Sequence, residues 1–519
     1  MRLMKNTCNR VEDLLINAAS RFRDKTAIIS LSENCEISFH TWLSDAYAFA
    51  GWLNSNFGDS PGCVILQTSN SYSFICAIFG GFIAGKTIVP ISPKTDSRTL
   101  SFILSDCRPV LGLIDENGGK DLYIENGCDV FELHRVMDDL KSLNHTKKYL
   151  SQNAKSISDF NDIALIIYTS GSTDLPKGVV CPHRQVLFAT NAINSILCNS
   201  QEDVILCGLP FSFDYGLYQI FLMLHGCATL VVAEDFSVPM AIPYWIDKFK
   251  VTGFPGVPSL FQMLIESRLL ERGRLDQLRY STSTGDVFPV ETILTLRSIL
   301  PSTTIFPMYG LTECKRVSIL PPCDFEGHEA SVGKPLPGTK VFVVDEDGKI
   351  LPANEVGELV VQGPHVMQGY LNNPKVNSVR FSLNSCTNET WLHTGDIFRI
   401  DNEGFLFFEG RKQGFLKLRD QRISPVAIEK SLSGLADIQQ VAVVGAKDSL
   451  GRDSVFVFVR PEKGKNVTSQ MISSKTRDLL PVSLAPNQVN ILKKTFPVTQ
   501  NGKIDRNNLS ELACRMLKQ

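Results

Sequence analysis

The segment IIYTSGSTDLPKGVV at 166–180 combines small hydroxylated side chains, glycine and one lysine directly after an apolar run. Hydroxyl groups, backbone N–H donors and one cation together suit the binding of phosphate groups. The candidate ligands are Thr169, Ser170, Gly171, Ser172, Thr173 and Lys177. The segment is not a P-loop, because Pro176 stands before the lysine and removes a backbone donor. Taken alone, such a cluster is more often a polar surface loop, so its interpretation depends on the rest of the chain.

Four further segments whose residues could bind a ligand or take part in catalysis follow in order: STGDVFP at 283–289, MYGLTE at 308–313, LHTGD at 392–396 and PVTQNGKIDR at 497–506. Each has an ordinary explanation by itself, such as a helix N-cap or a solvated lysine in an Asn-Gly hairpin. Their common order and spacing favour another interpretation. Over about residues 10–515 the chain resembles the superfamily of adenylate-forming enzymes, which includes acyl-CoA synthetases, amino-acid adenylation domains and luciferases.

The resemblance implies a site for ATP and Mg²⁺. The loop YTSGSTDLPKG would grip the distal phosphates, Tyr309 would stack on adenine, and Thr312 would contact phosphate. Glu313 would hold Mg²⁺, since one carboxylate that shares the ion with phosphate oxygens is its usual mode of binding. Asp396 would bind both ribose hydroxyls, a task that suits a carboxylate. The other expected nucleotide contacts are Gly285, Asp286, Met308, Gly310 and Arg411.

The resemblance also implies a reacting centre and a hinge. Lys503 would bind the substrate carboxylate and the α-phosphate, because attack of one anion on another needs positive charge between them. Thr169 and Glu313 complete the expected catalytic set. The segment at 410–429 resembles the hinge between a large and a small domain, with Gln413 at the hinge position. The resemblance implies two half-reactions, formation of an acyl-adenylate from ATP and transfer of the acyl group to a thiol. We expect the small domain to turn about Gln413 between them.

Three residues depart from the family pattern. Asp174 replaces the usual last glycine of the phosphate loop and places a carboxylate beside a polyanion. Gln413 stands where Asp or Lys is usual, and Asp420 replaces a glycine beside the expected pantetheine channel. The Asp420 side chain would narrow the channel through which the thiol enters, or would add a negative charge to it. These departures therefore bear on the second half-reaction more than on the fold.

The acyl pocket is expected within 209–232, where Phe213 and Asp214 are the candidate substrate contacts. A buried carboxylate without a cation is costly, so Asp214 should either pair with a substrate amine or accept bonds from backbone donors. The amine is favoured, because an unneutralised acid would repel a simple carboxylate substrate. The phrase FSFDYGLYQ also resembles prolyl ligases that load carrier proteins in natural-product biosynthesis, which makes L-proline the best single candidate.

The thiol acceptor is expected to come from a separate phosphopantetheinyl carrier protein or from coenzyme A. We expect no fused carrier domain, because the sequence ends soon after Arg506. An acyl-CoA ligase for a fatty or aryl acid is an alternative that predicts CoA turnover and no need for an amine. A non-catalytic binding protein of the same fold is another, and the presence of Lys177, Glu313, Asp396 and Lys503 disfavours it.

The elements that position these residues are predicted by the patterning. Short β-branched runs such as IALIIY at 163–168 and KVFVVD at 340–345 alternate with helix-like stretches, which indicates α/β layers. We predict a large α/β domain at 1–410, with layered sheets, helices and a small β subdomain. The tail contains strands and one helix starting at Ser424-Pro425, which predicts a small mobile α+β domain at 411–519 that carries the lysine.

Composition limits the partners. The chain has 519 residues, and its 52 Lys plus Arg nearly balance 54 Asp plus Glu, so nothing indicates a nucleic-acid or membrane partner. The apolar run at 74–85 is too short to span a bilayer and predicts a buried helix. Without a signal-peptide pattern, a cytoplasmic location is expected. The 14 cysteines contain no CxxC pair, which argues against a zinc site.

Overall fold

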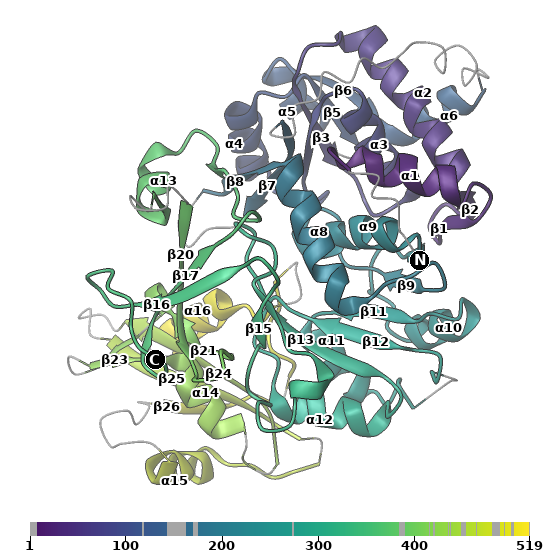
Figure 1. The fold of residues 1–519 in the computed structure, drawn as a ribbon. Coiled ribbons are helices and arrows are strands. Elements are labelled where there is room, and N and C mark those ends of the chain that lie inside the picture. Colours follow the sequence, from purple (N-terminus) through teal and green to yellow (C-terminus); the bar gives the residue numbers. More distant parts are fainter. Residues whose placement is uncertain are drawn as a thin grey trace.

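The fold is described by a computed structural model (Figure 1). It describes residues 8–517 except 117–118, 143–161, 170–174, 272–274, 384–389, 415, 419–420, 434, 436, 448–452, 463, 480–487, 493 and 500–502. Most of the predicted phosphate loop, with Asp174, and also Asp420 lie outside the described residues.

A 7-stranded sheet forms the first layer of the large domain. Its strands are β3 Cys63–Gln67, β4 Thr87–Pro90, β5 Leu111–Ile114, β6 Asp129–Glu132, β7 Ile163–Thr169, β8 Lys177–Pro182 and β18 Gly369–Tyr370. Their order is β18-β8-β7-β4-β3-β5-β6. The pairs from β7 to β6 are parallel, whereas β8 pairs antiparallel with β7 and β18. The end of β7 and the start of β8 therefore lie at one edge of the parallel core.

A 9-stranded sheet forms the second layer. Its strands are β1 Thr26–Ser30, β2 Cys35–Ser38, β9 Val204–Cys207, β10 Thr229–Val232, β11 Gly253–Gly256, β12 Tyr280–Ser283, β13 Thr304–Tyr309, β14 Ser318–Ile319 and β15 Lys334–Pro335. The order is β15-β14-β13-β12-β11-β9-β10-β1-β2, parallel from β1 to β13. The carboxyl ends of parallel strands meet at one edge of a sheet, so the residues after β12 and β13 lie close together.

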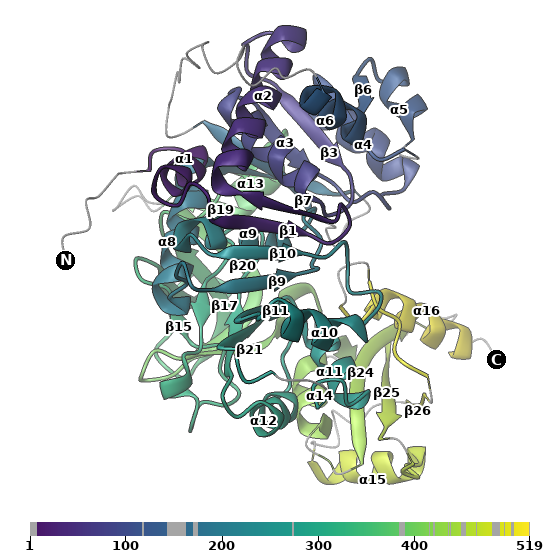
Figure 2. The same cartoon turned by 90° about the vertical axis from the view of Figure 1, so that its right-hand side faces the viewer.

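Helices cover both sheets (Figures 1 and 2). They are α1 Glu12–Arg21, α2 Phe39–Phe57, α3 Tyr72–Ile83, α4 Ser97–Cys107, α5 Lys120–Glu125, α6 Leu133–Ser142, α8 His183–Leu197, α9 Asp214–Gly226, α10 Ala241–Lys248, α11 Pro258–Glu266, α12 Val290–Ile299 and α13 Pro374–Arg380, with a 3₁₀ turn at Pro322–Asp324. A helix that is apolar on all sides is buried. This holds for α3, as predicted from the run at 74–85, and for most of α9.

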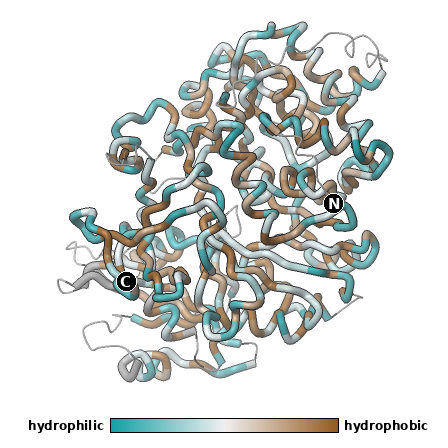
Figure 3. The backbone as a smooth tube through the Cα atoms, viewed as in Figure 1, coloured by the Kyte–Doolittle hydropathy of each residue, from teal (hydrophilic) through white to brown (hydrophobic). Residues whose placement is uncertain are grey.

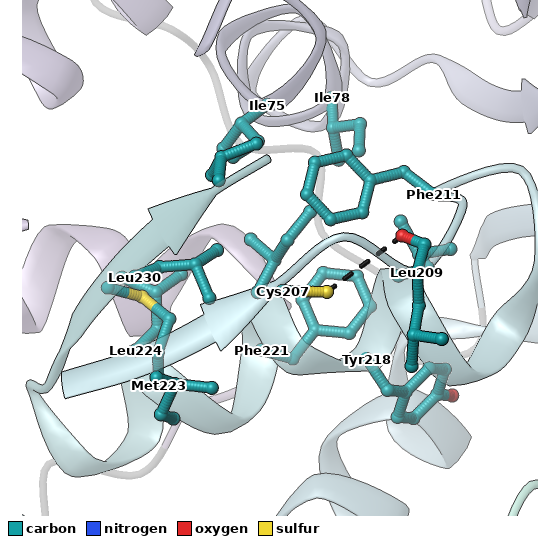
Figure 4. Close-up of a cluster of buried hydrophobic side chains, with 14 of the residues drawn as sticks. Ile75, Ile78, Cys207, Leu209, Phe211, Tyr218, Phe221, Met223, Leu224 and Leu230 are labelled. Carbon is teal, nitrogen blue, oxygen red and sulfur yellow. Dashed lines mark hydrogen bonds between the residues drawn. The ribbon is translucent and has the colours of Figure 1, made fainter. Parts of the chain in front are cut away.

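The largest apolar core lies around α3 and α9. Figure 4 shows Ile75 and Ile78 of α3 packing towards Phe211 and the side chains of α9. Along the tube in Figure 3, hydrophobic colours follow the inner strands and helices, whereas hydrophilic colours gather at the outer turns. The first turn of α9 is thus fixed by apolar packing, and this fixes the position of Asp214.

The predicted β subdomain is an antiparallel sheet. Its strands are β16 Lys340–Val344, β17 Val356–Gln362, β19 Phe381–Leu383, β20 Thr390–Ile400 and β21 Leu406–Arg411, in the order β16-β17-β20-β19 with β21 paired to β20. Asp396 and Arg411 are direct partners across β20 and β21. The register thus brings together two residues that the sequence singled out.

The smaller C-terminal domain is built on a three-stranded sheet with helices. Its elements are β22 Leu416–Leu418, β23 Gln421–Ile423, α14 Pro425–Ser433, β24 Ile438–Lys447, β25 Asp453–Pro461, α15 Ser469–Leu479, β26 Gln488–Ile491 and α16 Arg506–Leu517, preceded by a 3₁₀ turn at Lys412–Gly414. Alternate residues of β24 and β25 belong to two apolar clusters, one with α14 and α15 and one with α16.

The predicted fold class is confirmed: a large N-terminal α/β domain is followed by a smaller C-terminal domain. The boundary at 410 and 411 stays a prediction. Among the described helices, none combines the length and apolar character needed to cross a bilayer. The cysteines that the structure describes are all free thiols.

Candidate active site

The two ends of the predicted phosphate loop lie side by side. Thr169 ends β7, Lys177 begins β8, and the two residues are direct partners in the antiparallel register. The Lys177 ammonium lies 5.7 Å from the centre of the Tyr370 ring. The structure thus places one predicted cation beside β18, whereas Ser170, Gly171, Ser172 and Thr173 lie outside its described residues.

Glu313 lies buried beside the same tyrosine. Tyr370 donates a hydrogen bond to Glu313 Oε1, and an Arg380 guanidinium nitrogen lies 3.7 Å from that oxygen. One carboxylate with Arg380 and Lys177 close by suits a metal ion bound between phosphates, because the carboxylate can hold the ion and the cations can hold phosphate oxygens. No sequence motif pointed to Tyr370 or Arg380, which are contributed by β18 and α13.

Tyr309 and Asp396 form the next part of the site. The Tyr309 hydroxyl donates to Asp396 Oδ2 at 2.7 Å, and Arg411 Nε lies 3.4 Å from Asp396 Oδ1. Burial raises the pKa of Asp396, while Arg411 and the Tyr309 hydrogen bond lower it. The Tyr309 ring packs on Phe398 with 4.6 Å between centres. The two motifs therefore meet at one carboxylate.

Two positions of the expected nucleotide pocket, Gly285 and Gly310, require glycine for different steric reasons. A Cβ on Gly310 would lie 1.9 Å from the Lys315 carbonyl oxygen, so only glycine fits this turn. Gly285 has φ +98°, a backbone region that favours glycine. Of the neighbouring predicted contacts, Met308 and Thr312 are buried.

Lys503 reaches this pocket from the C-terminal domain. Its carbonyl oxygen accepts from Thr499 N at 2.8 Å, and its N–H donates to the Thr499 hydroxyl at 3.3 Å. The ammonium lies 5.5 Å from the centre of the Phe213 ring, and Lys503 Cε is 3.4 Å from a Cβ built on Gly285. Burial lowers the pKa of Lys503, and Arg411 lowers it further. The predicted lysine and the predicted acyl pocket are therefore brought together.

Side chains of both domains hold this arrangement. Arg506 pairs with Glu429 at 2.9 Å inside the C-terminal domain and lies 3.9 Å from Asp286 of the large domain. The predicted Asp286 thus faces a cation of the other domain. The hinge residue Gln413 lies in the 3₁₀ turn after β21.

Asp214 is the first residue of α9, where the helix dipole favours a negative charge. The sequence suggested a substrate amine or backbone donors as partners of Asp214, and the structure adds a cation of the protein, because Lys315 Nζ lies 3.9 Å from Asp214 Oδ2. Lys315 and Arg316 are buried and were missed. The sequence contained a signal for them. Two adjacent cations in CKRVSIL follow directly after MYGLTE, within a segment that is otherwise mostly apolar.

The cysteines near the site are not poised as nucleophiles. Cys181 is buried, and burial raises its pKa to about 11. Burial also raises the pKa of Cys314. Since the thiolate is the nucleophile, neither residue suits covalent catalysis.

Comparisons with known proteins fit this geometry. A sequence profile described as AMP-binding enzyme matches residues 15–371, and one described as AMP-binding enzyme C-terminal domain matches residues 427–503. Long-chain-fatty-acid–CoA ligase of Salmonella typhimurium is 26% identical over 548 residues, covering 96% of this chain and 94% of the relative.

Two solved structures are similar over most of their length. ATP-bound MatB from Rhodopseudomonas palustris has a TM-score of 0.86 at 21% identity, covering 98% of this chain and 99% of that chain. VinN in complex with L-aspartate has a TM-score of 0.69 at 30% identity, covering 77% of this chain and 98% of that chain. These matches define an AMP-forming acid–thiol ligase. The chain belongs to the AMP-binding enzyme family.

Proposed function

We propose that the protein activates a small amino acid with ATP as an aminoacyl-adenylate and then passes the acyl group to a phosphopantetheine thiol. The observation that carries this proposal is the position of Asp214. Its buried carboxylate follows Phe213, whose ring the Lys503 ammonium approaches to 5.5 Å. A substrate that directs its carboxylate to Lys503 can therefore direct its ammonium to Asp214.

The nucleotide would bind across the large domain. Tyr309 stacks on adenine, Asp396 with Arg411 binds the ribose hydroxyls, and the loop from Thr169 to Lys177 holds the distal phosphates. Glu313 would hold Mg²⁺, which neutralises phosphate charge when it is bound. The cluster of Glu313, Lys177 and Arg380 around Tyr370 supports this assignment.

The first half-reaction forms an acyl phosphate bond. A carboxylate oxygen of the amino acid attacks the α-phosphorus, the bond to the bridging oxygen breaks, and pyrophosphate leaves. Lys503 stands between the two anions and lowers their repulsion, so positioning and charge neutralisation provide the acceleration. In the second half-reaction, the thiol sulfur loses its proton and attacks the acyl carbon, and AMP leaves.

An amino acid suits the pocket better than a fatty acid. Asp214, Lys315 and Arg316 are buried charges, and burying an alkyl chain against them would desolvate them without compensation. The VinN complex with L-aspartate supports the amino-acid assignment, while the Salmonella relative keeps an acyl-CoA ligase as the second candidate. L-Proline stays a prediction, and so does a separate carrier protein as the acceptor.

Amino-acid-dependent ATP–pyrophosphate exchange tests the proposal. Each proteinogenic amino acid would be compared with fatty and aryl acids at equal concentration. Exchange with an amino acid supports the proposal, and exchange only with acids that lack an amine overturns it in favour of the acyl-CoA ligase. Thioester formation on a phosphopantetheinylated carrier protein, with free coenzyme A as the comparison, then distinguishes the two acceptors.

A further inference from the structure

Three charged side chains lie together in the buried acyl pocket. Asp214, Lys315 and Arg316 are only 9%, 5% and 7% exposed. The Lys315 ammonium lies 3.9 Å from Asp214 Oδ2, too far for a hydrogen bond. It also lies 5.2 Å from the centre of the Tyr218 ring, and the Arg316 guanidinium lies 5.3 Å from that of Tyr215. Both cations therefore face the first turns of α9.

Several polar atoms of this pocket lack partners. Within the part of the chain that the structure describes, Lys315 Nζ, Arg316 Nε and Tyr218 Oη are buried and make no hydrogen bond. Figure 4 shows Tyr218 at the edge of the apolar cluster, with its hydroxyl directed away from Ile75 and Ile78. A buried N–H donor of a charged group that has no acceptor is costly. Such a cluster indicates a polar ligand with acceptor oxygens.

The backbone holds Lys315 in a conformation that few residues adopt. Its φ is +61°, in the left-handed region, where a side chain other than that of glycine is strained. The backbone of Gly310 packs closely against that of Lys315, since a Cβ on Gly310 would lie 1.9 Å from the Lys315 carbonyl oxygen. Strain that is maintained at a buried charged residue points to a function for its side chain.

The charges of the pocket also favour an acid. Lys503 is left for the reacting carboxylate, so the other pocket charges are the single negative charge of Asp214 and the two positive charges of Lys315 and Arg316. A neutral amino acid brings only its ammonium to this group, which suits Asp214 and leaves both cations without an anion. An acidic amino acid brings a second carboxylate as well, and the two cations can share it. A monocarboxylate cannot do so, because its only carboxylate must lie at Lys503.

We propose that the substrate is an amino dicarboxylic acid, whose second carboxylate binds Lys315 and Arg316 while its ammonium binds Asp214. This inference rests on the proposed function and specifies its substrate class. Lys315 provides three donors and Arg316 its free Nε–H, and both suit a carboxylate. Arg316 is itself fixed, because one of its terminal nitrogens donates to the Thr284 hydroxyl at 2.7 Å.

Substrate comparison with the unaltered enzyme tests this inference first. L-Aspartate and L-glutamate would be compared with L-asparagine, L-proline and L-alanine, and with succinate, which lacks the amine. Exchange that is highest with an acidic amino acid supports the inference. Exchange that is highest with L-proline or another neutral amino acid overturns it and leaves the proposed function intact. Exchange only with succinate or with monocarboxylates overturns the proposed function as well.

Removal of the Lys315 charge tests the assigned contact. Lys315→Met replaces the unbranched side chain by an uncharged one that is one atom shorter, and it should raise the KM for the acidic amino acid by about 10- to 100-fold, the loss expected for a buried charge-assisted hydrogen bond. The KM for ATP should not change, and the preference for L-aspartate over L-asparagine should fall or reverse. Lys349→Met, at an exposed lysine, is the matched control. An unchanged preference in a folded Lys315→Met enzyme would contradict the inference.

Discussion

Tyr309 donates its hydroxyl proton to Asp396 Oδ2 at 2.7 Å and so joins two motifs that are far apart in the sequence. The tyrosine is the last residue of β13 in the 9-stranded sheet, whereas the aspartate lies in β20 of the antiparallel sheet. The proposed adenine and ribose contacts are thus one hydrogen-bonded unit.

Tyr309→Phe should weaken nucleotide binding in a pH-dependent way. Burial raises the pKa of Asp396 and the Tyr309 hydrogen bond lowers it, so removal of the hydroxyl raises it further. A protonated carboxyl cannot accept from both ribose hydroxyls. The KM for ATP should therefore rise as pH falls, and this acidic limb should begin at a higher pH in Tyr309→Phe. If the KM for ATP rises at the same pH in the wild-type enzyme and in Tyr309→Phe, the hydrogen bond between Tyr309 and Asp396 does not affect nucleotide binding. The measurement is the pH profile of the KM for ATP.

Lys503→Ala should abolish adenylate formation while thioester formation from supplied aminoacyl-adenylate survives. The proposed role of the lysine ends when pyrophosphate leaves, so only the first half-reaction depends on its charge. Exchange and single-turnover thioester assays measure the two steps separately. Equal loss in both would show that Lys503 acts beyond the first step.

The pH dependence of that first step gives an independent check on Lys503. Burial lowers the pKa of this ammonium, so it loses its proton at a lower pH than an exposed lysine. Adenylation should fall as pH rises through that lowered pKa. In Lys503→Arg the guanidinium keeps its charge, and the alkaline limb should disappear even if the rate is lower. A limb that persists in Lys503→Arg would belong to another group.

The fold could be predicted from the sequence because the patterns that define it are local. The run IALIIY at 163–168 became β7, and the apolar run at 74–85 became the buried helix α3. Lys503 and Asp396 were predicted because each stands within a motif whose spacing is visible in the sequence. These predictions needed no knowledge of distant contacts.

The partners of Asp214 could not be predicted in the same way. Lys315 lies in the connection between β13 and β14 and reaches the first residue of α9 only through the tertiary fold, and no local pattern records that proximity. From the sequence, only a substrate amine or backbone donors were considered as partners of Asp214, and the tertiary fold supplies a cation of the protein. The contacts of Glu313 with Tyr370 and Arg380 were missed for the same reason, since α13 and β18 carry no motif.

Glu313→Gln should raise the Mg²⁺ concentration needed for half-maximal exchange. The amide keeps the size of the side chain and its hydrogen bond to Tyr370 but loses the charge that attracts a divalent cation. A rise of about 10-fold or more is expected if the carboxylate is a direct ligand. Tyr370→Phe is the control, because it leaves the carboxylate charged. An unchanged Mg²⁺ requirement in Glu313→Gln would show that other residues bind the ion.

The arrangement of the two domains that brings Lys503 to the acyl pocket should depend on a pair of charges remote from the chemistry. Arg460 of β25 lies 3.2 Å from Glu266 at the end of α11, and next to them Gln440 donates to Gln262 at 2.7 Å. Glu266→Ala should slow adenylation about 5-fold, the effect of losing a partly exposed ion pair of roughly 1 kcal/mol. Thioester formation from supplied adenylate should not change, because we expect the C-terminal domain to turn about Gln413 before that step. The exchanged pair Glu266→Arg with Arg460→Glu should restore adenylation if the contact itself is what matters. Equal slowing of both half-reactions in Glu266→Ala would show that the pair stabilises the fold and not this arrangement of domains.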